Sequence, residues 1–194
     1  MIRLALLRHG HTEWNRQGRI QGRTDIPLDD DARKQLADMA LPPPWDSADL
    51  VASPLRRAVD TARLVGKRAP RIEPALIEMN WGDWEGQQRL VLDAQPDSGY
   101  RPIETWGWNY SPPCGESPAA LRDRLLPWAE SLDGDTLAIC HIGVMRVLLA
   151  HATGWNFDGP APFRVKRNRL YLIDISADGW SHPPATVPLS AGEA

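Results

Sequence analysis

An apolar run, Ile2-Arg3-Leu4-Ala5-Leu6-Leu7, leads directly into Arg8-His9-Gly10-His11-Thr12-Glu13-Trp14-Asn15 near the start of the 194-residue chain. The run has no helical period, which is typical of a strand buried on both faces of an α/β sheet. Ligands bind beyond the carboxyl ends of strands in such sheets, so Arg8 and His9 are expected at a ligand site. An Arg fork beside a Gly that admits close backbone approach suits an anion.

Strand and helix patterns alternate along the rest of the chain, which is typical of a layered α/β fold with a mainly parallel sheet. Strands are predicted at 49–52, 71–74, 136–140 and 170–175. Helices are predicted at about 29–40, 53–66, 117–132 and 144–153, and Ser53 is the expected N-cap of the second. The length fits a single domain spanning 1–194.

One segment lacks regular patterning. Between about residues 79 and 115 the chain is irregular and rich in tryptophan, which indicates a cap or lid. Trp81, Trp84, Trp106 and Trp108 could stack on an apolar or aromatic ligand, or they could simply pack the cap against the sheet. The sequence is compatible with both interpretations.

The composition argues against several classes of binding partner and of protein. The net charge of -3, without a basic run, argues against nucleic acid. Cys114 and Cys140 do not suggest a disulfide framework. The sequence enters its first strand at once, and no run reaches membrane-spanning length, so a cytoplasmic protein without a membrane partner is expected.

Three later blocks complete a pattern with the opening motif. They are Ser53-Pro54-Leu55-Arg56-Arg57-Ala58, Glu78-Met79-Asn80-Trp81-Gly82-Asp83-Trp84-Glu85-Gly86 and Cys140-His141-Ile142-Gly143-Val144-Met145-Arg146. Together with Arg8-His9-Gly10 and Thr12-Glu13-Trp14-Asn15, they resemble the histidine phosphatase superfamily over residues 1 to about 153. The resemblance implies a phosphoglycerate mutase-like, three-layer α/β/α sandwich with a variable cap.

Two histidines and two arginines around one dianion form an apparatus for phosphoryl transfer. The resemblance implies that His9 is the nucleophile, forming a phosphohistidine, with its second ring nitrogen held by the backbone. Arg8 and Arg57 would clamp the phosphoryl oxygens, and a protonated His141 would neutralise developing charge. Glu78 would protonate the leaving oxygen and later activate water, which requires a raised pKa.

Further positions are expected to contact phosphate or substrate: Asn15, Gln21, Gly22, Trp81 and Ile142. Two of the motif positions depart from the family pattern. His11 stands where the family often has Glu or Gln, and Ile142 replaces a frequent glycine. A β-branched residue at 142 adds bulk and resists positive φ, which changes the expected shape of the pocket.

The predicted activity is metal-independent and cofactor-free hydrolysis of a small organic phosphomonoester. The size and the Gly82-Asp83-Trp84-Glu85-Gly86 region resemble the small broad-specificity and α-ribazole phosphatases.

Three alternative functions remain compatible with the sequence. His9 and His11 could form a metal pair, although no further ligand pattern accompanies them. The chain could be a phosphoglycerate mutase-type enzyme, although residues 87–115 offer only Arg89 and Arg101 as cations. A non-catalytic phospho-ligand or protein-binding member would generally lose a core residue.

Overall fold

A mainly parallel sheet organises the computed structural model, which describes residues 1–191. The strand order is β4-β3-β5-β1-β6-β7, and β8 pairs with β6. The bounds are β1 Ile2–Arg8, β3 Asp49–Ala52, β4 Arg71–Ile72, β5 Thr136–Cys140, β6 Arg169–Ser176, β7 Gly179–Ser181 and β8 Val187–Pro188. β1, β3, β4 and β5 are parallel to one another, whereas β6 runs antiparallel to β1.

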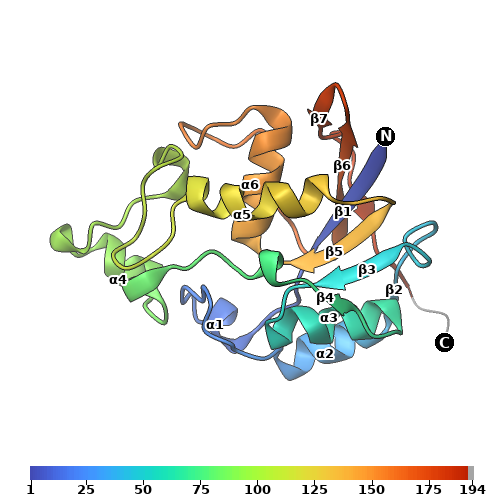
Figure 1. Ribbon diagram of the computed structural model, residues 1–194. Coiled ribbons are helices and arrows are strands. Elements are labelled where there is room, and N and C mark those ends of the chain that lie inside the picture. Colours follow the sequence, from blue (N-terminus) through green and yellow to red (C-terminus); the bar gives the residue numbers. More distant parts are fainter. Residues whose placement is uncertain (192–194) are drawn as a thin grey trace.

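Helices cover both faces of this sheet (Figure 1). α2 and α3 lie on one face, and α5 and α6 lie on the other. The helix bounds are α1 Glu13–Arg16, α2 Asp30–Ala37, α3 Arg56–Gly66, α4 Arg89–Asp93, α5 Pro118–Glu130 and α6 Ile142–Thr153. The predicted three-layer α/β/α architecture is confirmed.

Successive side chains of β1 point to opposite faces of the sheet, and each face has its own hydrophobic core. Leu4 and Leu6 point into the core shared with α5 and α6, whereas Ala5 and Leu7 point into the core shared with α2 and α3. All four side chains are fully buried. This packing on both faces fixes the register of β1 and therefore the position of the residues that follow it.

Some predicted elements differ from those observed. α3 begins at Arg56 with Leu55 as N-cap, so the prediction of Ser53 as N-cap was wrong: Ser53 bonds a histidine side chain instead. α2 ends at Ala37, short of the predicted end at Ala40, because β2 (Met39–Ala40) pairs with β9 (Ser190–Ala191). The strands after Gly179 were not predicted.

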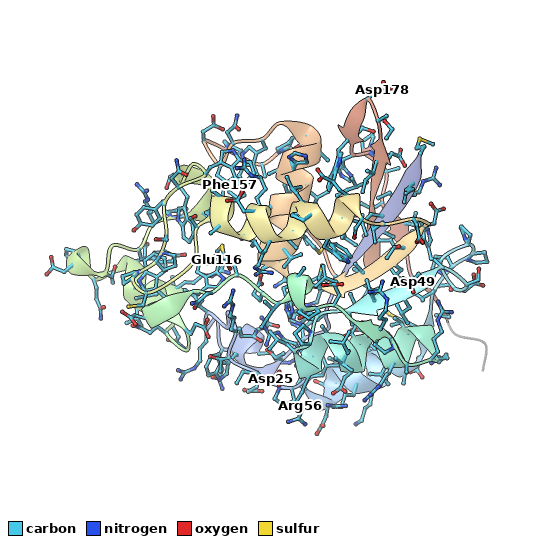
Figure 2. All side chains as sticks on the ribbon, in the orientation of Figure 1. Asp25, Asp49, Arg56, Glu116, Phe157 and Asp178 are labelled. Atoms are coloured by element: carbon cyan, nitrogen blue, oxygen red, sulfur yellow. The ribbon has the colours of Figure 1, made fainter. Side chains whose placement is uncertain are left out.

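The segment between β4 and α5 contains only short helical pieces. These are Pro74–Leu76, Gly82–Trp84, α4, Pro96–Ser98 and Ile103–Thr105. The segment extends beyond the carboxyl ends of β3 and β5 (Figure 1). Glu116, labelled in Figure 2, ties it to α5: Oε1 accepts from Arg124 Nε at 3.1 Å and Oε2 from the Asn80 backbone N–H at 3.1 Å. Among residues 1–191, no helix is long and apolar enough to cross a membrane.

Candidate active site

The pairing of β1 with β5 brings two histidines together. The His9 backbone N–H donates to the Cys140 carbonyl at 3.0 Å, which continues the ladder one residue past the end of β1. His9 and His141 therefore lie side by side, with ring centroids 5.1 Å apart. Both side chains are buried. This is the edge of the sheet where the carboxyl ends of the parallel strands meet, as the sequence predicted.

The His9 ring is held by its own loop. Its Nδ1 lies 2.6 Å from the Gly10 carbonyl oxygen, so Nδ1 carries the proton and donates it, and the Nε2 lone pair is left free. The predicted backbone hydrogen bond to the ring is confirmed. Burial, with the neighbouring His141 and the positive charge of Arg57 adding to it, holds the pKa of His9 well below its ordinary value. A neutral imidazole with a free Nε2 is a nucleophile that needs no base.

His141 has a different partner. Its Nε2 lies 2.6 Å from Ser53 Oγ, while its Nδ1 is buried and has no partner among residues 1–191. Burial, then Arg57 and Arg8, hold the pKa of His141 well below its ordinary value. The expected protonation of His141 therefore depends on the charge of a bound phosphate, since a dianion raises the pKa of a neighbouring imidazole.

Arg8 and Arg57 each have a buried side-chain N–H group near His9 that has no acceptor among the described residues. Arg57, in the first turn of α3, donates from Nη1 to the Thr24 carbonyl at 2.8 Å and from Nη2 to the Gly22 carbonyl at 2.7 Å. Its Nε and that of Arg8 are buried without an acceptor among the described residues. Burial, followed by the charge of Arg167, lowers the pKa of Arg8 to about 9. Buried cations with unpaired N–H groups form a strong anion site.

Glu78 lies at the N-terminus of α6. Oε2 accepts from the Gly143 backbone N–H at 3.2 Å, and Oε1 accepts from those of Met79 and Val144 at 2.9 and 3.3 Å. Burial raises the pKa of Glu78 despite these hydrogen bonds. The predicted direction of the shift is confirmed, and it favours a carboxyl group that can hold a proton.

The Glu78 shift predicts a pH-dependent stability difference. Because the folded pKa is raised above 4.5, protonated Glu78 contributes stability that is complete below that value and is lost as the pH rises through the folded pKa. The melting temperature of the unmodified protein should therefore fall, relative to that of Glu78→Gln, as the pH rises from 4 to 8, because only the unmodified protein must ionise a buried carboxyl group. Thermal denaturation at both values measures this, with exposed Glu130→Gln as the matched control. The assignment would be contradicted if the stability of Glu78→Gln relative to the parent were lower at pH 8 than at pH 4.

Asn15 is held by a residue that the sequence did not reveal. Its Oδ1 accepts from the Thr12 backbone N–H at 3.2 Å and from Arg167 Nη2 at 2.8 Å. Arg167 Nε also donates to the His9 carbonyl at 3.1 Å. With Oδ1 occupied, the Asn15 Nδ2 donor remains available for a ligand. Arg167 stands in a loop after α6 without any motif, so no local signal pointed to it.

Arg167 should act through Asn15 and His9. Arg167→Gln removes the Nε and Nη2 donors and leaves a shorter, uncharged side chain, so we expect kcat/KM for p-nitrophenyl phosphate to fall by about tenfold or more. Because Asn15 and Arg167 act as one unit, Asn15→Ala combined with Arg167→Gln should cost little more than the larger single loss. Steady-state kinetics of the two single variants and the double variant measure this. Full additivity of the two losses would show that the residues act independently.

The loop after α1 is fastened by Glu85. Glu85 Oε1 accepts from the Arg23 backbone N–H at 2.8 Å, and Oε2 accepts from that of Thr24 at 2.8 Å. Gly22 has a φ of +54°, and a Cβ there would lie 1.9 Å from Glu85 Oε1, so only glycine fits. The loop carbonyls that Arg57 binds are thus fixed from the cap side.

Three further residues predicted to contact substrate, Gln21, Ile142 and Trp81, lie in different surroundings. Gln21 is buried, and its Oε1 has no partner among residues 1–191. Ile142 lines a cavity beside α6. Trp81 packs against Trp84 and Trp106, with ring centroids 6.4 and 5.3 Å away. This mutual packing favours the interpretation in which the tryptophans support the cap.

Residues 4–182 match the histidine phosphatase superfamily (branch 1). The chain belongs to this superfamily. A glucosyl-3-phosphoglycerate phosphatase of Mycolicibacterium vanbaalenii is 33% identical over 175 residues, 80% of this chain and 76% of the relative. An adenosylcobalamin/alpha-ribazole phosphatase of Salmonella typhimurium is 32% identical over 185 residues, 90% of this chain and 91% of the relative.

A solved structure titled phosphoglycerate mutase, from Thermus thermophilus, superposes with a TM-score of 0.73 at 28% identity, covering 99% of this chain and 100% of that one. The superfamily membership and the phosphatase relatives confirm the predicted class of activity: the chain is a histidine phosphatase. Within residues 1–191, no three His, Cys, Asp or Glu side chains group as metal ligands would, and the paired positions His9 and His11 gain no third partner.

Proposed function

We propose that this histidine phosphatase hydrolyses a small organic phosphomonoester through a phosphohistidine at His9, without a metal ion. The observation that carries the proposal is the hydrogen bond from His9 Nδ1–H to the Gly10 carbonyl, because it fixes the tautomer with a free Nε2. The adjacent His141 ring and the unpaired Nε donors of Arg8 and Arg57 supply the charge that a phosphoryl group requires.

In the first step, His9 Nε2 attacks phosphorus in line. The N–P bond forms as the bond to the ester oxygen breaks, and Glu78 gives its proton to that oxygen. The transferred oxygens are held by Arg8, Arg57, His141 and the Asn15 amide. The leaving alcohol is released neutral, and Glu78 remains as a carboxylate.

In the second step, a water molecule attacks the phosphohistidine. Glu78 takes a proton from the water as its oxygen bonds to phosphorus, and the N–P bond breaks. Inorganic phosphate leaves, and His9 returns to its neutral form. Both protonation states of Glu78 are used in turn, which suits a carboxyl whose pKa burial has raised.

The test is hydrolysis of p-nitrophenyl phosphate in excess chelator. Undiminished release of nitrophenol supports the metal-free mechanism, whereas restoration of lost activity by one divalent cation would contradict it. The relatives act, by their names, on glucosyl-3-phosphoglycerate and on α-ribazole phosphate, so each is a sound first natural substrate to assay.

The mutase-type alternative is supported by one observation, the superposition on a structure titled phosphoglycerate mutase. Incubation with 3-phosphoglycerate distinguishes a hydrolase from a mutase. A hydrolase releases inorganic phosphate and glycerate, whereas a mutase accumulates the 2-phospho isomer. The phosphatase names of the two relatives favour hydrolysis.

A further inference from the structure

The peptide group that joins His9 to Gly10 is held from two sides. Its carbonyl oxygen accepts from Arg167 Nε at 3.1 Å, and its N–H, on Gly10, donates to Thr61 Oγ1 at 3.0 Å. The next carbonyl along the chain, that of Gly10, accepts the hydrogen bond from His9 Nδ1. Thr61 therefore binds the residue that orients the nucleophile, although none of the roles proposed above uses it.

The Thr61 hydroxyl has a fixed direction. Thr61 lies on α3, one turn after Arg57, and is fully buried. Its hydroxyl donates to the Arg57 carbonyl at 2.7 Å, a contact that a helical threonine can make to the residue four positions earlier. A hydroxyl has one proton and two lone pairs, so Oγ1 can accept the Gly10 N–H while it donates to Arg57.

Gly10 needs such a restraint from outside its own loop. The position is closely packed, since a Cβ there would lie 2.7 Å from Leu36 Cδ1 and 3.1 Å from Leu28 Cδ2. Glycine satisfies this packing, but it also has more backbone freedom than any other residue. The direction of the Gly10 carbonyl therefore depends on the groups that hold its backbone, and the hydrogen bond to Thr61 is one of them.

Removal of the hydroxyl would affect its two partners differently. Thr61 Oγ1 is the acceptor that the structure gives the buried Gly10 N–H within residues 1–191, so that donor would lose its hydrogen bond. The Arg57 carbonyl lies inside α3, where the helical ladder still uses it as an acceptor. The loss should therefore act on the His9 loop more than on Arg57.

Resting on the function proposed above, we infer that Thr61 is a positioning residue for the nucleophile. By accepting the Gly10 N–H, it fixes the carbonyl that receives the proton of His9 Nδ1, and so keeps Nε2 unprotonated and directed at phosphorus. This role involves no contact with the phosphoryl group. Loss of Thr61 should accordingly slow phosphoryl transfer and leave the binding of phosphate by Arg8 and Arg57 largely intact.

The kinetic test replaces the hydroxyl with a methyl group. In Thr61→Val we expect kcat/KM for p-nitrophenyl phosphate to fall by about tenfold or more, while the inhibition constant of inorganic phosphate stays within about threefold of the parent value. Thr61→Ser, which keeps the hydroxyl, should retain most of the activity. Thermal denaturation verifies that each variant is folded.

Thr136→Val is the matched control. It removes another buried hydroxyl, which donates to the Gly134 carbonyl at the end of β5 opposite His141. We expect its kcat/KM to stay within about twofold of the parent value.

Nitrogen NMR of isotopically labelled histidine rings tests the positioning directly and requires no turnover. The signals of His9 are those missing from His9→Ala. In the unmodified protein we expect a protonated Nδ1 and an unprotonated Nε2, and in Thr61→Val a mixture of the two tautomers. If Thr61→Val does not fold, Thr61→Ala removes the same hydroxyl without adding bulk and takes its place in both experiments.

Four results would overturn the inference. They are a kcat/KM in Thr61→Val within about threefold of the parent, an equal loss in Thr61→Ser, an equal loss in Thr136→Val, and unchanged His9 ring signals in Thr61→Val. Activity that still requires His9 in those cases leaves the proposed function intact. Hydrolysis that survives in His9→Ala would overturn the proposed function, and this inference with it.

Discussion

His9→Ala is expected to lower kcat/KM for p-nitrophenyl phosphate by at least about 10⁴-fold, because the variant lacks the atom that attacks phosphorus. The backbone of the site should survive, since the His9 main chain is held independently by the Cys140 carbonyl and by Arg167. Steady-state release of nitrophenol measures the loss, and circular dichroism with thermal denaturation verifies the fold. Retention of more than about a tenth of the activity would be incompatible with His9 as the nucleophile.

His11→Gln is the matched control for His9→Ala. It removes a neighbouring imidazole and installs a residue that the family often carries at this position. We expect its kcat/KM to stay within about tenfold of the parent value. If instead His9 and His11 together held a metal ion, both variants would lose activity severely, and chelation would do the same to the unmodified protein.

Arg57→Ala should reduce both activity and stability. The guanidinium fixes the carbonyls of Gly22 and Thr24 and keeps its Nε for a phosphoryl oxygen, so we expect kcat/KM to fall by about 10³-fold. Leaving those carbonyls unpaired should lower the free energy of unfolding by roughly 1–3 kcal/mol. Phosphatase kinetics and urea denaturation measure the two effects.

Arg57→Lys separates the charge from the shape of the side chain. An ammonium group keeps the charge but cannot reach both carbonyls and a phosphoryl oxygen together, so its kcat/KM should lie between those of Arg57→Ala and the parent. Arg63→Gln, on the same helix but exposed, should change neither property appreciably. Activity in Arg57→Ala within about threefold of the parent would contradict the assignment.

Short buried strands were the most predictable part of the fold. β3 and β5 have the bounds that the sequence predicted, because each is an apolar run ended by a change to polar residues. The residues that follow β1 and β5 are brought together by parallel pairing alone, so His9 and His141 could be expected as neighbours. The short strands after Gly179 have no periodicity over two or three residues and gave no signal.

Long-range polar contacts could not be predicted. Ser53 has good N-cap chemistry, yet its hydroxyl bonds His141, which is 88 positions away in sequence. Arg167 reaches the His9 carbonyl across 158 positions. Each contact depends on the packed positions of elements that no local pattern relates. For the same reason, the aromatic cluster around Trp84 and the cavity at Arg146 emerged only from the folded chain.

Transfer of the phosphoryl group to His9 is tested most directly by trapping the phosphorylated enzyme. The unmodified protein, His9→Ala and Glu78→Gln would each be mixed with radiolabelled p-nitrophenyl phosphate, quenched in base and digested, and the labelled peptide located by mass spectrometry. We expect label on His9, stable to base and lost in acid. It should accumulate most in Glu78→Gln, where water is poorly activated while nitrophenol leaves without an acid, and it should be absent from His9→Ala. Label on any other residue, or label that persists in His9→Ala, would contradict the mechanism.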